Sequence, residues 1–194
     1  MEDSTDQQFE KVLARCRSLF ERKLKDYGPA WLIFRPASIT DQILIKALRI
    51  RSLEQKEDRA LIPETRDVEY VGIINYSIIG LMIMWFDERL PSAATIFQPE
   101  QVRRFSDDSI LACYDAVTAK AGDLMRRKNH DYDEAWRAMR LSSITDQMLV
   151  KLARLRQIES NAGELIASEG TDSQYCDILN YAVFGLLLMP ATAA

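Results

Sequence analysis

The chain contains one stretch of sequence twice, as Ser38-Ile-Thr-Asp-Gln-Ile-Leu-Ile-Lys46 and as Ser143-Ile-Thr-Asp-Gln-Met-Leu-Val-Lys151. The two copies are offset by 105 residues, and the match continues without a gap on both sides. The agreeing residues outside the stretch include Asp26-Tyr27 with Asp131-Tyr132, Ala30-Trp31 with Ala135-Trp136, Asn75-Tyr76 with Asn180-Tyr181, and Gly80 with Gly185. Self-similarity at a fixed offset indicates a duplicated structural unit. We therefore divide the chain into a first repeat over 1–86, a connector over 87–105 and a second repeat over 106–194.

Both copies of the stretch are predicted to be buried helices, because apolar residues occur nearly all the way round them at 100° per residue. The main apolar arc of the first copy consists of Ile39, Ile43, Ala47, Ile50 and Leu53. An amphipathic helix is expected before each copy, over about 6–25 and 107–129, and a third, strongly apolar helix after it. The pattern predicts an all-α fold, in which a duplicated three-helix motif forms one pseudo-twofold helical bundle with the third helices at its centre.

Local signals predict where these helices begin and end. Ser38, Thr40 or Asp41 is expected to cap the second helix of the first repeat. Gly28-Pro29 is expected to end the helix before it, whereas the second repeat has Asp133-Glu134 there, which favours a more helical path.

The composition is that of an ordinary globular protein, with 47% hydrophobic and 28% charged residues in a chain of 194. A net charge of -4 argues against general nucleic-acid binding, which normally requires a basic excess. The acidic N-terminus lacks the apolar core of a signal peptide, and the apolar run over 71–86 is short for a membrane span. We therefore expect a cytoplasmic protein without a membrane-spanning helix. Association into a homodimer is left open.

A polar stripe runs along each predicted central helix. It consists of Gln42, Lys46 and Arg49 in the first repeat and is repeated as Gln147, Lys151 and Arg154 in the second. A buried cation is costly unless it meets an anion. We therefore expect Lys46 and Lys151 to be at least half buried and within ion-pair reach of a carboxylate from another helix. A ligand phosphate is the other anion that could meet them.

The ordered set of repeated residues resembles the nucleotide modification associated domain family, helical domains of bacteria and phages with unknown function that also occur as tandem copies. The residues that carry the resemblance in the first repeat are Lys23, Asp26-Tyr27-Gly28, Ala30-Trp31, Lys46, Arg49, Glu64 and Asn75-Tyr76. Those in the second repeat are Lys128, Asp131-Tyr132, Ala135-Trp136, Lys151, Arg154, Glu169, Asp177 and Asn180-Tyr181. The family looks distantly similar to MazG-type nucleoside triphosphate pyrophosphohydrolases, but this chain has Lys and Arg on its central helices where those enzymes have carboxylates.

The resemblance implies a nucleotide ligand and a magnesium ion. The residues expected to bind phosphate are Lys46, Arg49, Lys128, Lys151 and Arg154. Tyr132 and Trp136 are expected to stack on the base, and Glu169, Asp172 and Asp177 to bind the metal. Asp177 has Gly72 as its counterpart, so the second repeat is expected to hold the site. Gly72 is then expected to permit close approach of helices in a structural first repeat.

Two alternatives stand beside that interpretation. In the first, the chain is a non-catalytic helical scaffold or interaction protein whose repeated charges form internal ion pairs, since structural networks imitate functional sites. In the second, Asp177 pairs with Lys151 or Arg154 instead of binding a metal.

Overall fold

The computed structural model describes residues 3–56, 61, 65–98, 107–161 and 170–190. The first repeat contains α1 (Thr5–Tyr27), η1 (Ala30–Ile33), α2 (Pro36–Gln55) and α3 (Arg66–Phe86). The second contains α5 (Asp107–Asp131), η4 (Ala135–Ala138), α6 (Leu141–Ser160) and α7 (Thr171–Leu188). The described part of the connector forms two short 3-10 turns, η2 (Asp87–Arg89) and η3 (Ala93–Phe97). Helices and turns make up the described chain, which contains no strand, and this confirms the all-α prediction.

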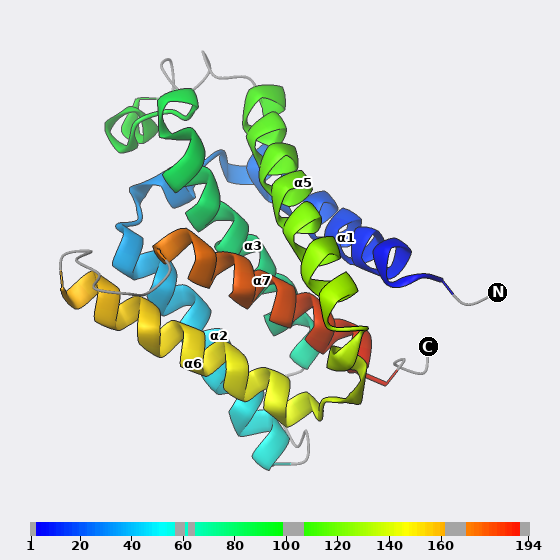
Figure 1. Cartoon of the computed structure of the whole chain (residues 1–194). Coiled ribbons are helices and arrows are strands. Elements are labelled where there is room, and N and C mark those ends of the chain that lie inside the picture. The colour runs from blue at the N-terminus through cyan, green and yellow to red at the C-terminus, as the bar shows by residue number, and fades with distance from the viewer. Residues whose placement is uncertain (1–2, 57–60, 62–64, 99–106, 162–169, 191–194) are drawn as a thin grey trace.

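The helices form three layers, each with one helix from each repeat (Figure 1). Helices α3 and α7 lie in the middle and pack against each other, and α2 and α6 cover one side of them. Helices α1 and α5 cover the other side. The third helices are therefore at the shared centre, as the apolar pattern predicts. Because every layer contains both repeats, the two repeats form one bundle.

The central layer is buried because α3 and α7 are apolar on nearly every side. Ile73, Ile74, Ile78 and Leu81 of α3 are completely buried. Among the described residues, one helix, Arg66–Arg89, is long and apolar enough by composition to cross a membrane, and 61% of its apolar window is buried inside the bundle. Such burial agrees with the prediction of a core helix.

The repeated threonine of the opening stretch joins the two repeats. Thr40 Oγ1 donates a hydrogen bond to Glu159 Oε1 at 2.6 Å and lies 2.9 Å from the Tyr175 hydroxyl. By the pseudo-twofold, Thr145 Oγ1 donates to Glu54 Oε1 at 2.8 Å and lies 3.5 Å from the Tyr70 hydroxyl. Burial raises the pKa of both tyrosines to about 12, so they stay protonated and can donate. The recurrence of Thr40 as Thr145 is therefore explained by the contact between the two repeats.

The predicted N-cap of α2 is wrong. The helix begins at Pro36, a favoured first-turn residue, and its cap is Arg35, which makes no side-chain capping hydrogen bond. Ser38, Thr40 and Asp41 therefore lie inside the helix. Thr40 is completely buried, and its hydroxyl serves the contact between the repeats instead.

Candidate functional site

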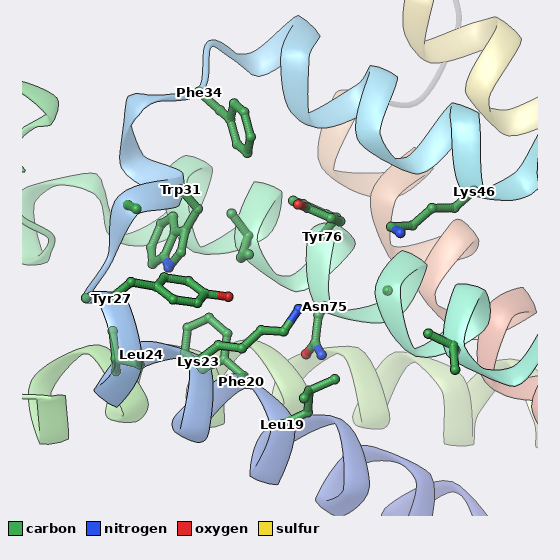
Figure 2. Close-up of a pocket in the computed structure, with 15 residues that line it drawn as sticks. Leu19, Phe20, Lys23, Leu24, Tyr27, Trp31, Phe34, Lys46, Asn75 and Tyr76 are labelled. Carbon is green, nitrogen blue, oxygen red and sulfur yellow. The ribbon is translucent and has the colours of Figure 1, made fainter. Parts of the chain in front are cut away.

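A pocket of about 350 Å³ opens in the first repeat, between α1, η1, α2 and α3 (Figure 2). It is lined by many of the residues that recur in the second repeat, namely Lys23, Tyr27, Ala30, Trp31, Lys46, Asn75 and Tyr76. These positions are spread over more than fifty residues of sequence, and the helix packing brings them to one place. Some of the repeated residues thus join the repeats, and others line this pocket.

Aromatic rings form one wall of the pocket. Tyr27 is 59% exposed at the mouth, whereas Trp31 is buried beneath it. Phe34 and Tyr76 face each other with ring centroids 6.3 Å apart. The indole Nε1 of Trp31 points toward Tyr27 in Figure 2 and has no hydrogen-bond partner in the described part of the chain. In the second repeat, Trp136 Nε1 donates to Asn129 Oδ1 at 3.0 Å, but the counterpart of Asn129 is Leu24.

The two lysines of the pocket differ in their partners. Lys46 Nζ lies 3.1 Å from Glu69 Oε2, and Glu69 also accepts from Arg49. The Lys46 and Glu69 side chains are 24% and 6% exposed, which confirms the prediction of a buried lysine paired with a carboxylate on another helix. Lys23 is exposed and makes no ion pair with any described residue. Figure 2 shows Lys23 and Lys46 reaching from opposite sides toward Asn75 and Tyr76.

Asn75 is held in place by both outer helices. Its Nδ2 donates to the Cys16 carbonyl of α1 at 3.3 Å, and its Oδ1 accepts from the Tyr114 hydroxyl of α5 at 2.8 Å. The amide is therefore oriented at the pocket wall by residues of both repeats. A side chain with satisfied hydrogen bonds is a rigid element of a binding site.

The second repeat has larger or charged side chains at the matching positions. Asp177, the counterpart of Gly72, accepts from Lys128 Nζ at 2.6 Å and lies 2.7 Å from Lys151 Nζ. Burial alone would raise the pKa of Asp177, but the two lysines outweigh it and lower the pKa below its usual value. Phe184, the counterpart of Ile79, stacks on Trp136 at 4.4 Å between centroids. These side chains fill positions that the first repeat leaves to the pocket.

The structure brings the residues predicted to bind phosphate together in two pairs, each on a carboxylate of the chain, and leaves Arg154 apart. Lys46 lines the pocket, whereas Arg49 is engaged with Glu69. Lys128 and Lys151 both contact Asp177, so the predicted pairing of Asp177 with Lys151 is present. Arg154 is exposed, because the counterpart of Glu69 is the uncharged Gln174.

The four described residues among those predicted for stacking and metal binding have separate surroundings. Tyr132 is 72% exposed, whereas Trp136 is buried between Phe184 and the Arg137 guanidinium. Asp172 accepts from Trp85 Nε1 at 3.4 Å, Asp177 is engaged by two lysines, and Glu169 lies outside the described residues. Within the described ranges, no three His, Cys, Asp or Glu residues cluster as metal ligands would. The two described acids thus do not fit a cation site, and magnesium stays a prediction.

The sequence predicts the binding site in the second repeat, and that stays a prediction; the pocket described above and the contact made by Gly72 are features of the first repeat. The pocket lies in the first repeat, and Gly72 makes room for the Lys46 side chain rather than for a neighbouring helix. A Cβ atom on Gly72 would lie 2.8 Å from both Cδ and Cε of Lys46. Sequence reasoning missed Lys23, Tyr27, Trp31, Asn75 and Tyr76 as one site. Their joint recurrence in both repeats was the signal that could have identified them.

Comparison with known proteins identifies the repeats. The model of a family described as nucleotide modification associated domain 1 matches the chain twice, over residues 23–84 and 128–189. The two matches together cover more than half of the chain, and each begins at the repeated lysine, Lys23 or Lys128. None of the comparisons shows the distant similarity to MazG-type enzymes. No curated protein and no solved structure matched the chain.

Proposed function

The chain belongs to the nucleotide modification associated domain 1 family, and from that premise we propose that its first repeat binds a nucleotide in the pocket between α1, α2 and α3. One observation carries the proposal: repeated residues of the family-matched segment line a single pocket that combines two lysines with an aromatic wall.

The chemistry of the pocket suits a nucleotide in three respects. Its volume of about 350 Å³ lies within the usual range for small-molecule sites. Tyr27, Phe34 and Tyr76 offer ring faces on which a base can stack. Lys23 and Lys46 supply ammonium groups, which bind phosphate as point charges. The unpartnered Trp31 Nε1 provides a donor for an acceptor atom of the base or sugar.

The alternative function is a helical scaffold without a ligand. The pairing of Lys46 and Arg49 with Glu69, and of Lys128 and Lys151 with Asp177, supports it, because these charges are neutralised within the chain. Under this alternative the pocket is an unfilled surface depression, and nucleotides do not stabilise the fold.

Thermal unfolding in the presence of nucleotides separates the two functions. We expect a melting temperature that rises with nucleotide concentration, because a ligand that binds only the native state adds to stability. The screen is run with and without magnesium, so that the predicted metal is tested in the same experiment. Absence of any shift across nucleoside mono-, di- and triphosphates favours the scaffold.

Three lysine and arginine variants locate the site. Lys23→Ala is expected to abolish the nucleotide-dependent shift. Lys128→Ala removes the equivalent lysine of the second repeat, and Arg22→Ala removes the same charge from an exposed neighbour that does not line the pocket. Both of these variants should keep the shift. A shift that survives Lys23→Ala but is lost in Lys128→Ala would contradict the assignment to the first repeat.

A further inference from the structure

We infer that an anionic group of the ligand binds between Lys23 and Lys46, beside Gly72, at the position that the second repeat fills with its own carboxylate, Asp177. This inference deepens the proposed function and rests on it for the identity of the ligand as a nucleotide. The second repeat then serves as an internally occupied copy of the binding site.

The second repeat shows how the repeated lysines hold an anion. Lys128 of α5 and Lys151 of α6 approach the two oxygens of one α7 carboxylate, at 2.6 and 2.7 Å. Asp177 is mostly buried, so solvent does little to weaken the contact with Lys151, whose side chain is 14% exposed. The arrangement thus joins one carboxylate to cations from two other helices.

The first repeat has the same cations without that anion. The counterparts of Lys128, Lys151 and Asp177 are Lys23, Lys46 and Gly72. Glu69 is already engaged by Lys46 and Arg49, and Lys23 has no carboxylate among the described residues. In the described part of the first repeat, the cation without a carboxylate is Lys23, which lines the pocket. In the described part of the second repeat it is Arg154, which is exposed on the surface.

Gly72 supplies no carboxylate, and the space beside it is taken by the Lys46 side chain. Because Gly72 has no side chain, the methylene groups of Lys46 lie against the α3 backbone, and a Cβ atom there would be 2.8 Å from two of them. The ammonium group has three donors, so Lys46 can bind Glu69 and a ligand anion together.

The same geometry indicates the class of nucleotide. The two ammonium groups match one anionic group, since a single carboxylate occupies both of them in the second repeat. Further phosphates would lie near Glu69, which carries a negative charge next to Lys46. A nucleoside monophosphate therefore fits the pocket better than a triphosphate.

The test introduces a carboxylate at position 72, the first-repeat counterpart of Asp177. Gly72→Asp is compared with Gly72→Asn, which has the same shape without the charge. We expect Gly72→Asp to melt at a higher temperature than Gly72→Asn, because the new carboxylate joins Lys23 and Lys46. The probes are inorganic phosphate, a panel of nucleoside monophosphates and the corresponding nucleosides, with sodium chloride at matched ionic strength.

The wild-type protein should be stabilised by phosphate and by one of the monophosphates. The affinity for each of these anions should be at least about tenfold lower in Gly72→Asp than in Gly72→Asn, as expected for the loss of a charge-assisted contact. In the converse variant, Asp177→Gly, phosphate should stabilise the fold more than it stabilises the wild type, since a second anion site is exposed. Equal phosphate affinity in Gly72→Asp and Gly72→Asn would overturn the inference.

The outcomes distinguish this inference from the proposed function. If a monophosphate binds and Gly72→Asp leaves that binding unchanged, the anion position is wrong and nucleotide binding stands. Suppose instead that nucleotides stabilise the wild type no more than inorganic phosphate does, and that Gly72→Asp removes this stabilisation. The anion position then stands, and nucleotide binding fails. If neither phosphate nor any nucleotide stabilises the wild type, both proposals are overturned.

Discussion

At the scale of single residues, the two repeats keep the same cations and place their carboxylates differently. The first repeat has Glu69 where the second has Gln174, and the second has Asp177 where the first has Gly72. Each carboxylate contacts the lysine of the second helix of its own repeat, Lys46 of α2 or Lys151 of α6. The carboxylate that pairs with this lysine is therefore three residues further along the third helix in the second repeat than in the first.

Lys151→Ala is expected to lower the free energy of unfolding by about 3 kcal/mol, because it leaves the mostly buried Asp177 without its less exposed partner. Lys128, whose side chain is 43% exposed, compensates little. Urea unfolding measures the loss. Arg154→Ala, three residues further on at an exposed position, serves as the control and should change stability by less than about 0.5 kcal/mol. Similar losses in both variants would show that the buried pair contributes nothing special.

At the scale of elements, the turn after the first helix of each repeat lies at matching positions but differs in both residues and backbone conformation. Gly28 follows α1 with φ 65° and ψ -165°, a conformation that glycine alone adopts readily. The second repeat was expected to be more helical here, but Asp133 and Glu134 take φ values of 47° and 55°. Glu134 is held there by Thr5 and by Arg137 Nε at 2.6 Å. Tertiary contacts therefore impose a left-handed turn on residues that favour other conformations.

Asp133→Gly should stabilise the protein by about 1 kcal/mol, because glycine adopts a positive φ without the steric cost that a side chain incurs. The matched change in the first repeat, Gly28→Ala, should destabilise it by about 1–3 kcal/mol. Opposite shifts of the two chemical denaturation midpoints are the expected result. A loss of stability in Asp133→Gly would mean that the aspartate side chain makes a contribution larger than its backbone strain.

At the scale of the whole molecule, the repeats are interlocked by tyrosines that cross the pseudo-twofold. Tyr70 of the first repeat packs on Gly185 of the second, and Tyr175 packs on Gly80 of the first. Both tyrosine hydroxyls also reach the threonine of the opposite repeat. The repeated glycines and threonines therefore belong to one interface, which explains their recurrence without reference to a ligand.

Gly185→Ala is expected to destabilise the protein by about 2 kcal/mol or more, because its Cβ would lie 2.4 Å from Cε1 of the completely buried Tyr70 ring. Gly122→Ala is the control, since the nearest atoms there are 3.7 Å away in the Arg126 guanidinium. This control should gain up to about 1 kcal/mol from the better helix propensity of alanine. Equal effects on the melting temperature would show that the tyrosine contact tolerates an added methyl group.

The sequence by itself determined the helices, the duplication and the burial of Lys46 and Lys151. Its prediction that α2 and α6 are buried nearly all round is wrong, because these helices form an outer layer and leave Ile45, Leu48 and Val150 exposed. Helical periodicity is a local property, so the apolar arcs of α2, α3 and their repeats can be recognised along the chain. The burial of Lys46 and Lys151 follows from the same arcs, and their need for an anion follows from the cost of an unpaired buried charge.

Only the tertiary structure showed that repeated residues of the first repeat line one pocket. Lys23, Trp31, Lys46 and Asn75 recur as Lys128, Trp136, Lys151 and Asn180, so their identities favour neither repeat. The difference depends on how far a side chain at the position of Gly72 or Asp177 reaches toward helices remote in sequence. Glu69 pairs with Lys46, whereas Asp177 pairs with Lys128 and Lys151, and which charges meet is set by the packing of three helices rather than by the spacing along any one of them.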